Sequence, residues 1–125
     1  MIDETFYKVV DKQSAEPLHC RYTVIFNVNH DIFKAHFPGN PIVPGVCSLE
    51  IVRQLVACML EIETEARIIS VKNMKFVSLM TPSVDKRFVF DIALSQKTDS
   101  QYVTKVSILD GDSVAVKASL VCEIQ

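Results

Sequence analysis

The sequence has little glycine, no tryptophan and no long apolar run. Only three of its 125 residues are glycine, so flexible joints are scarce and each glycine is expected where the backbone needs it. The longest apolar stretch, residues 55–60, is far too short to cross a bilayer. Internal repeats and Gly/Ser-rich linkers are also absent. The length then predicts a single domain, residues 1–125, with one core.

Basic charge and metal-ligand spacing are missing as well. A net charge of −2 argues against nucleic-acid binding through an overall basic surface. The four cysteines have no Cys-x-x-Cys spacing and no histidine flanks them at zinc-ligand intervals, so we expect neither a metal site nor a cofactor. Unpaired thiols and the absence of a secretion signal at the start of the sequence favour a cytoplasmic protein without a membrane partner.

Strand patterns dominate the rest of the chain. Apolar and polar residues alternate cleanly over residues 20–29, and we predict six strands at residues 5–11, 20–29, 67–79, 87–95, 101–109 and 113–124. The connections are short, which indicates an antiparallel sheet. One long helix is predicted from Val46 to Ile62, and it is apolar almost all round, so it must be buried. These elements predict an α+β domain in which a curved sheet of about six strands wraps around one central helix.

The segment between the second strand and the helix is unusual. Residues 36–50 contain three prolines and two glycines. Each proline fixes its own φ and biases the preceding residue toward extended conformations, so the loop should be rigid and should present His36 in a defined place. Such rigidity suits a catalytic side chain on a loop.

The start of the helix is itself a candidate for a catalytic role. Gly45 enters the helix without a capping side chain, which leaves amide groups free to bind a carbonyl oxygen on which negative charge develops. Glu50 lies one turn further on, among apolar residues. Desolvation is expected to raise the pKa of this carboxyl group and to suit it to general acid catalysis.

These residues resemble a known signature. The motif reads His36-Phe37-Pro38-Gly39-x-Pro41-x-x-Pro44-Gly45-Val46-x-x-x-Glu50, followed by Gln54. It is similar to the signature of the hotdog-fold 3-hydroxyacyl-acyl-carrier-protein dehydratases of bacterial type II fatty acid synthesis. About 20 residues carry firm motif identity. Ala35 and Arg53 depart from the family pattern, Arg53 standing where the helix commonly has a small residue.

The resemblance implies an activity and a set of roles. His36 would remove the α-proton of a (3R)-3-hydroxyacyl thioester, Glu50 would protonate the departing hydroxyl group, and the Gly45 amide would bind the thioester carbonyl. The other substrate-binding residues would be Val46, Gln54 and Phe37. The substrate would be carried on the phosphopantetheine of an acyl carrier protein. The family builds each site from both protomers of a homodimer, and a further assembly of dimers stays open.

Other interpretations remain open at this stage. Glu50 has the spacing to pair with Arg53 on the helix surface, and Gln54 either orients the Glu50 carboxyl group or fills a polar pocket. Cys47, near the helix start, is expected to pack in the core rather than act as a nucleophile. A hotdog thioesterase and a non-catalytic acyl- or carrier-binding module are the alternative functions. Two interpretations are open for the basic residues Lys72, Lys75, Lys86 and Arg87: a docking patch for an acidic carrier protein, or solvated ends of strands.

Overall fold

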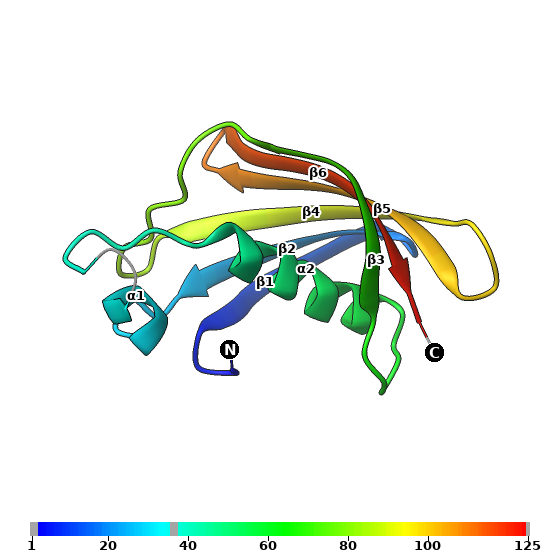
Figure 1. The fold of residues 1–125 in the computed structure, drawn as a ribbon, viewed down its shortest axis with the longest axis horizontal. Helices are drawn as coiled ribbons and strands as arrows, with labels where there is room; N and C mark the ends of the chain where they lie inside the picture. Colours follow the sequence, from blue (N-terminus) through cyan, green and yellow to red (C-terminus); the bar gives the residue numbers. More distant parts are fainter. Residues whose placement is uncertain (1–2, 36–37, 125) are drawn as a thin grey trace.

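The structure, a computed structural model, describes residues 3–35 and 38–124. Its strands are β1 (Tyr7–Glu16), β2 (His19–Phe26), β3 (Arg67–Phe76), β4 (Arg87–Gln96), β5 (Gln101–Asp110) and β6 (Ser113–Glu123), and its helices are α1 (Asp31–Ala35) and α2 (Gly45–Met59). The strands form one antiparallel sheet in the order β1-β2-β4-β5-β6-β3, with α2 lying across one face (Figure 1). The prediction of a six-stranded antiparallel sheet is confirmed.

The alternation in the sequence decides which face of the sheet is buried. Tyr22 and Val24 of β2 are buried, as are Phe88 and Phe90 of β4, while the residues between them are more exposed. The first hairpin is longer than the sequence predicts, because β1 continues to Glu16 and pairs with β2 along its length, with register shifts between Val9 and Asp11 and between Ser14 and Glu16. Residues 12–16, which lie outside the predicted strand at 5–11, therefore belong to β1, since cross-strand pairing outweighs their weak local preference.

Helix α2 is shorter and less enclosed than expected. It has 15 residues and ends three residues before the predicted end at Ile62. Glu61 lies just beyond it with φ of 53°, a left-handed conformation that cannot continue the helix. One side of α2 is buried, but Val46 is 56% exposed and Cys58 is also exposed. The prediction of a central helix covered on every side is thus wrong for a single chain.

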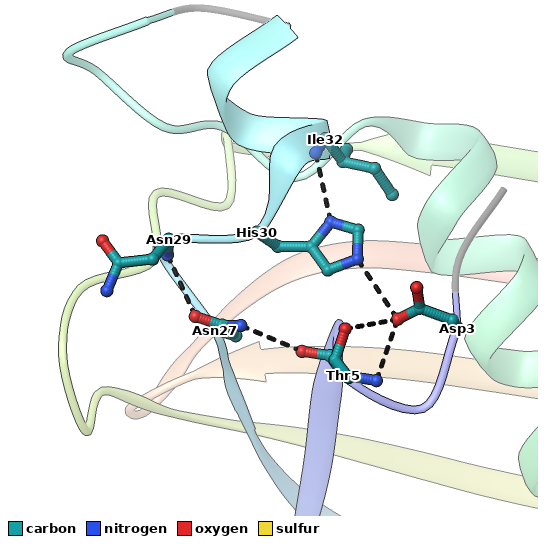
Figure 2. A network of polar contacts seen from close by, with 6 residues as sticks. All are labelled: Asp3, Thr5, Asn27, Asn29, His30 and Ile32. Carbon is teal, nitrogen blue, oxygen red and sulfur yellow. Dashed lines mark hydrogen bonds and ion pairs between the residues drawn. The ribbon is translucent and has the colours of Figure 1, made fainter.

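The short helix α1 has no counterpart among the predicted elements. Its start is capped by His30, whose Nδ1 accepts the Ile32 amide hydrogen at 3.1 Å. Because this ring nitrogen accepts, Nε2 carries the hydrogen and donates it to Asp3 Oδ1 at 3.2 Å (Figure 2). His30 lies in the loop between β2 and α1, and only 9% of its side chain is exposed. The network ties the start of the chain to the helix that precedes His36.

A cluster of phenylalanine rings packs against α1. Phe6 stacks on Phe33 of α1 with ring centroids 5.2 Å apart, and it meets Phe26 edge to face at 5.5 Å. Phe26 in turn meets Phe88 of β4 at 5.5 Å. Edge-to-face and stacked pairs add to the free energy gained by burying the rings. The cluster therefore anchors α1 to the end of the sheet.

Candidate active site

The start of helix α2 lacks a side-chain cap, as the sequence predicts. Pro44 occupies the N-cap position with φ −62° and ψ 145°, and its carbonyl accepts hydrogen bonds from the amides of Cys47 and Ser48 at 3.0 and 3.2 Å. The amides of Gly45 and Val46 have no hydrogen-bond acceptor among residues 3–35 and 38–124. Two donors at the positive end of the helix dipole are thus available to an oxygen atom.

The ring of Phe76 lies against this helix start. A Cβ atom added at Gly45 would meet Phe76 Cζ at 2.7 Å, closer than side-chain carbons approach one another. Phe76 is the last residue of β3 and is 57% exposed. A side chain at position 45 would therefore force the Phe76 ring to shift from its observed position. The motif spacing gives no signal for Phe76, because strand and helix meet only in the folded chain.

Glu50 is held by Arg53, one turn further along α2. Arg53 Nε donates to Glu50 Oε2 at 3.0 Å, and Arg53 Nη2 donates to Glu50 Oε1. Arg53 Nη1 also donates to the carbonyl of Ala66 at 3.2 Å, just before β3. The pairing between Glu50 and Arg53 that the sequence left open is present, and it engages both carboxylate oxygens.

This pairing reverses the expected shift of the Glu50 pKa. Hydrogen bonds and the charge of Arg53 lower the pKa of the carboxyl group, and they outweigh the partial burial that acts to raise it. The side chains of Glu50 and Arg53 are 26% and 19% exposed, so neither is fully desolvated. The prediction of a raised Glu50 pKa is wrong because it considered the apolar helix and not the neighbouring guanidinium group.

Gln54 continues the polar chain from the helix to the sheet. Its Nε2 donates to Glu50 Oε1 over a long 3.4 Å, and its Oε1 accepts a hydrogen bond from the Tyr7 hydroxyl at 2.8 Å. Burial raises the pKa of Tyr7 to about 12, so this hydroxyl stays protonated and remains a donor near neutral pH. The sequence gives no signal for Tyr7, because it lies 47 positions before Gln54 in the chain.

The structure describes only some of the remaining predicted residues. His36 and Phe37 lie outside the described residues. Val46 is exposed beside the free amides, and Cys47 is 1% exposed, with burial raising the pKa of its thiol. A buried thiol of raised pKa agrees with packing and not with a nucleophile. Lys86 is engaged within the fold, since it contacts Asp110 at 3.2 Å and lies over the Phe88 ring.

Residues 3–35 and 38–124 contain neither a cluster of metal ligands nor a helix that could span a membrane. No group of three or more His, Cys, Asp or Glu side chains in that part of the chain could hold a metal ion. No helix in the same residues is long and apolar enough to cross a membrane.

Comparison with known proteins identifies the family. Six antiparallel strands with a helix across one face define the hotdog class of folds. A sequence model of the ApeI-like family, described as ApeI dehydratase, matches residues 11–115, and the chain belongs to this family. The 3-hydroxyacyl-acyl-carrier-protein dehydratase FabZ of a Caulobacter species is 34% identical over 100 residues, which cover 73% of this chain. Those residues span only 59% of the relative's own length.

Solved structures support the fold assignment. A chain of the dehydratase heterocomplex ApeI:P from Xenorhabdus doucetiae aligns with a TM-score of 0.73 at 15% identity, covering 94% of this chain and 97% of that chain. A mutant thioesterase from Pseudomonas aeruginosa aligns with a TM-score of 0.59 at 10% identity, covering 90% and 78%. At these identities the likeness concerns the fold alone.

Proposed function

We propose that the protein dehydrates a (3R)-3-hydroxyacyl thioester, carried by an acyl carrier protein, to the trans-2-enoyl thioester. The observation that carries the proposal is the uncapped start of α2, with free amides at Gly45 and Val46 and a carboxyl group at Glu50 one turn further on, in a chain of the ApeI-like dehydratase family. The proline-rich segment that precedes the helix supplies His36.

The proposed reaction assigns one role to each group. His36 accepts the proton from the α-carbon, and the Gly45 amide holds the negative charge that develops on the thioester oxygen. The electron pair of the broken C–H bond forms the new double bond as the C3–O bond breaks. The hydroxyl group leaves as water after it takes a proton from Glu50. Gln54 orients the carboxyl group, and Val46 and Phe37 contact the acyl chain.

The Glu50–Arg53 pair has a consequence for this mechanism. Since the pKa of Glu50 is lowered, only a small fraction of the free enzyme holds the proton on Glu50 while His36 is neutral. That reverse-protonated fraction is the active one in the proposed reaction. A strong acid transfers its proton readily, which offsets part of the loss from its low population.

We also propose a homodimer that forms through β3. This strand is at the edge of the sheet, paired with β6, and it exposes Ile69 and Val71 at 43% and 47%. Exposed apolar edge strands are covered in native proteins, commonly by a second copy of the chain. Pairing two copies along β3 would bring the helix start near Phe76 close to the partner, which agrees with a site shared between protomers.

Hydrolysis of the same thioester is the second candidate. The lowered pKa of Glu50 favours it, because a carboxylate can take a proton from water as that water attacks the thioester carbonyl, and the thiol then leaves with a proton. Likeness in fold to a thioesterase from Pseudomonas aeruginosa is compatible with this reaction. The His36-Phe37-Pro38 segment favours dehydration.

Mass spectrometry of a 3-hydroxyacyl carrier thioester incubated with the purified protein separates these functions. A loss of 18 mass units, the mass of one water molecule, is the expected result and supports dehydration. Release of the free acid and the carrier thiol would establish hydrolysis instead. An unchanged substrate across several chain lengths would argue for a non-catalytic binding module.

A further inference from the structure

The Arg53 guanidinium group donates hydrogen bonds to two parts of the fold. Two nitrogen atoms bind the Glu50 carboxylate and the third binds the Ala66 carbonyl. We propose that Arg53 is a positioning residue that holds Glu50 as a charged carboxylate in one fixed orientation and thereby sets the pH range in which the site works. The proposal goes beyond the roles assigned above, and its kinetic part rests on the proposed function.

The geometry of the pair explains why orientation is fixed. A guanidinium group that binds both oxygens of a carboxylate restrains the plane of that group, which one hydrogen bond cannot do. The Ala66 carbonyl lies in the segment that leads into β3, so the guanidinium is itself anchored outside the helix. Glu50 is thus positioned relative to both α2 and the start of β3.

Few other charges act on the pair. Glu65, in the loop before β3, approaches Arg53 Nη1 at 3.9 Å, but its side chain is 81% exposed. Tyr7 of β1 faces the pair as a neutral hydroxyl, and Cys58 of α2 lies near Tyr7. Gln54 contributes one long hydrogen bond. Arg53 is therefore the main cause of the lowered pKa of Glu50, ahead of Gln54.

The direct test is the titration of Glu50 in the free protein. Carboxyl ¹³C resonances of glutamate are followed by NMR across acidic pH, with Glu50→Gln used to assign the Glu50 signal. Arg53→Gln is expected to move the Glu50 midpoint to higher pH. Arg53→Lys keeps the charge but loses the bidentate contact, so its Glu50 midpoint is expected between those of the wild type and Arg53→Gln.

Arg67→Gln is the matched control. Arg67 of β3 donates to Glu123 of β6 at 2.9 Å in a second arginine–glutamate pair, which has no contact with Glu50 among the hydrogen bonds of the described residues. This variant should leave the Glu50 midpoint unchanged. The proposal is overturned when Arg53→Gln and Arg53→Lys both fold, as judged by circular dichroism, and the Glu50 midpoint stays at the wild-type value in both.

Kinetics tests the second half of the proposal. In Arg53→Gln the acidic limb of kcat/KM should move to higher pH, in parallel with the Glu50 midpoint, because in a reverse-protonated enzyme the group of lower pKa sets that limb. Once the larger protonated fraction of Glu50 is taken into account, the turnover of the correctly protonated enzyme should fall about 10- to 100-fold, because the carboxyl group is no longer oriented. A merely structural arginine would lower the plateau without moving the limb, and that result overturns the kinetic part. If wild-type protein shows no dehydration, the proposed function fails while the NMR titration still decides the role of Arg53.

Discussion

Gly45 and Phe76 are fitted to one another, since a Cβ atom on the glycine would lie 2.7 Å from the Cζ atom of the ring. The contact joins the start of α2 to the end of β3, the edge strand. It therefore connects the free amides proposed to bind the thioester with the strand proposed to form the dimer.

Replacing this glycine should be costly unless the ring is also removed. Gly45→Ala is expected to displace the Phe76 ring and to lower turnover, and to destabilise the fold by about 1 kcal/mol, at the low end for overpacking because the ring is 57% exposed and can move. Adding Phe76→Ala should recover at least about 0.5 kcal/mol in a double-mutant cycle measured by urea unfolding. Val46→Ala, at the next and exposed position, is the control and should change stability by less than about 0.5 kcal/mol. Additive effects of Gly45→Ala and Phe76→Ala would contradict the contact.

The two proposed proton-transfer residues should each be needed for turnover. His36→Ala and Glu50→Gln are expected to lower kcat by about 10² to 10⁴ in the carrier thioester assay, since each removes a general base or acid. His19→Ala is a suitable control, because His19 is 43% exposed and pairs with Asp91 in the sheet. Turnover near the wild-type rate in a folded His36→Ala or Glu50→Gln protein would withdraw that residue from the mechanism.

A shared site makes a prediction about mixed dimers. His36→Ala and Glu50→Gln protomers, each inactive alone, should recover part of the activity when mixed, because some heterodimers then contain one complete site. Subunit exchange is checked by native mass spectrometry of differently tagged chains. No recovery after confirmed exchange would indicate that each site is built within one chain.

The sequence predicts elements well where the pattern is local. Alternation along β2 and β4 identifies the strands and their buried faces, and Pro44-Gly45 marks the helix start. It fails where distant residues decide the outcome. The length of β1 depends on pairing with β2, and the enclosure of α2 depends on what covers its second side.

The candidate site shows the same difference between local patterns, which the sequence predicts, and contacts between distant residues, which it does not. The sequence motif names Glu50 and Gln54, which do contact one another, but it does not predict that Tyr7 binds Gln54 from β1. The sign of the Glu50 pKa shift depends on a neighbour three residues away whose side chain has several rotamers. Hydrophobic surroundings alone predict a raised pKa, whereas the guanidinium contact lowers it.

The hydroxyl of Tyr7 should contribute to stability through its contact with the helix. Tyr7→Phe removes the 2.8 Å hydrogen bond to Gln54 while keeping the ring, and it is expected to cost about 1 kcal/mol in urea unfolding. Gln54→Leu removes the other partner. If the hydrogen bond carries the effect, the double variant should be less destabilised than the sum of the single variants, and strict additivity would argue against it.

Stability should fall at acidic pH in a way that depends on the Glu50–Arg53 pair. The pKa of Glu50 is lowered in the folded chain, so the unfolded chain binds a proton more readily. The pair's contribution is therefore fully present above the unfolded pKa, about 4.3, and is lost as the pH falls through the lower folded value.

This loss can be measured by urea unfolding at a series of pH values between about 7 and 2.5, a range that spans the unfolded pKa. Glu50→Gln should flatten the acidic decline, because the amide does not titrate. Glu123→Gln is the matched control: it also removes a glutamate whose pKa is lowered, by Gln101 and Arg67, but at an exposed pair where solvent weakens the interaction. The flattening should be larger for Glu50→Gln than for Glu123→Gln. Equal slopes in the wild type and in Glu50→Gln would show that the contact with Arg53 does not hold the carboxylate in its charged form in solution.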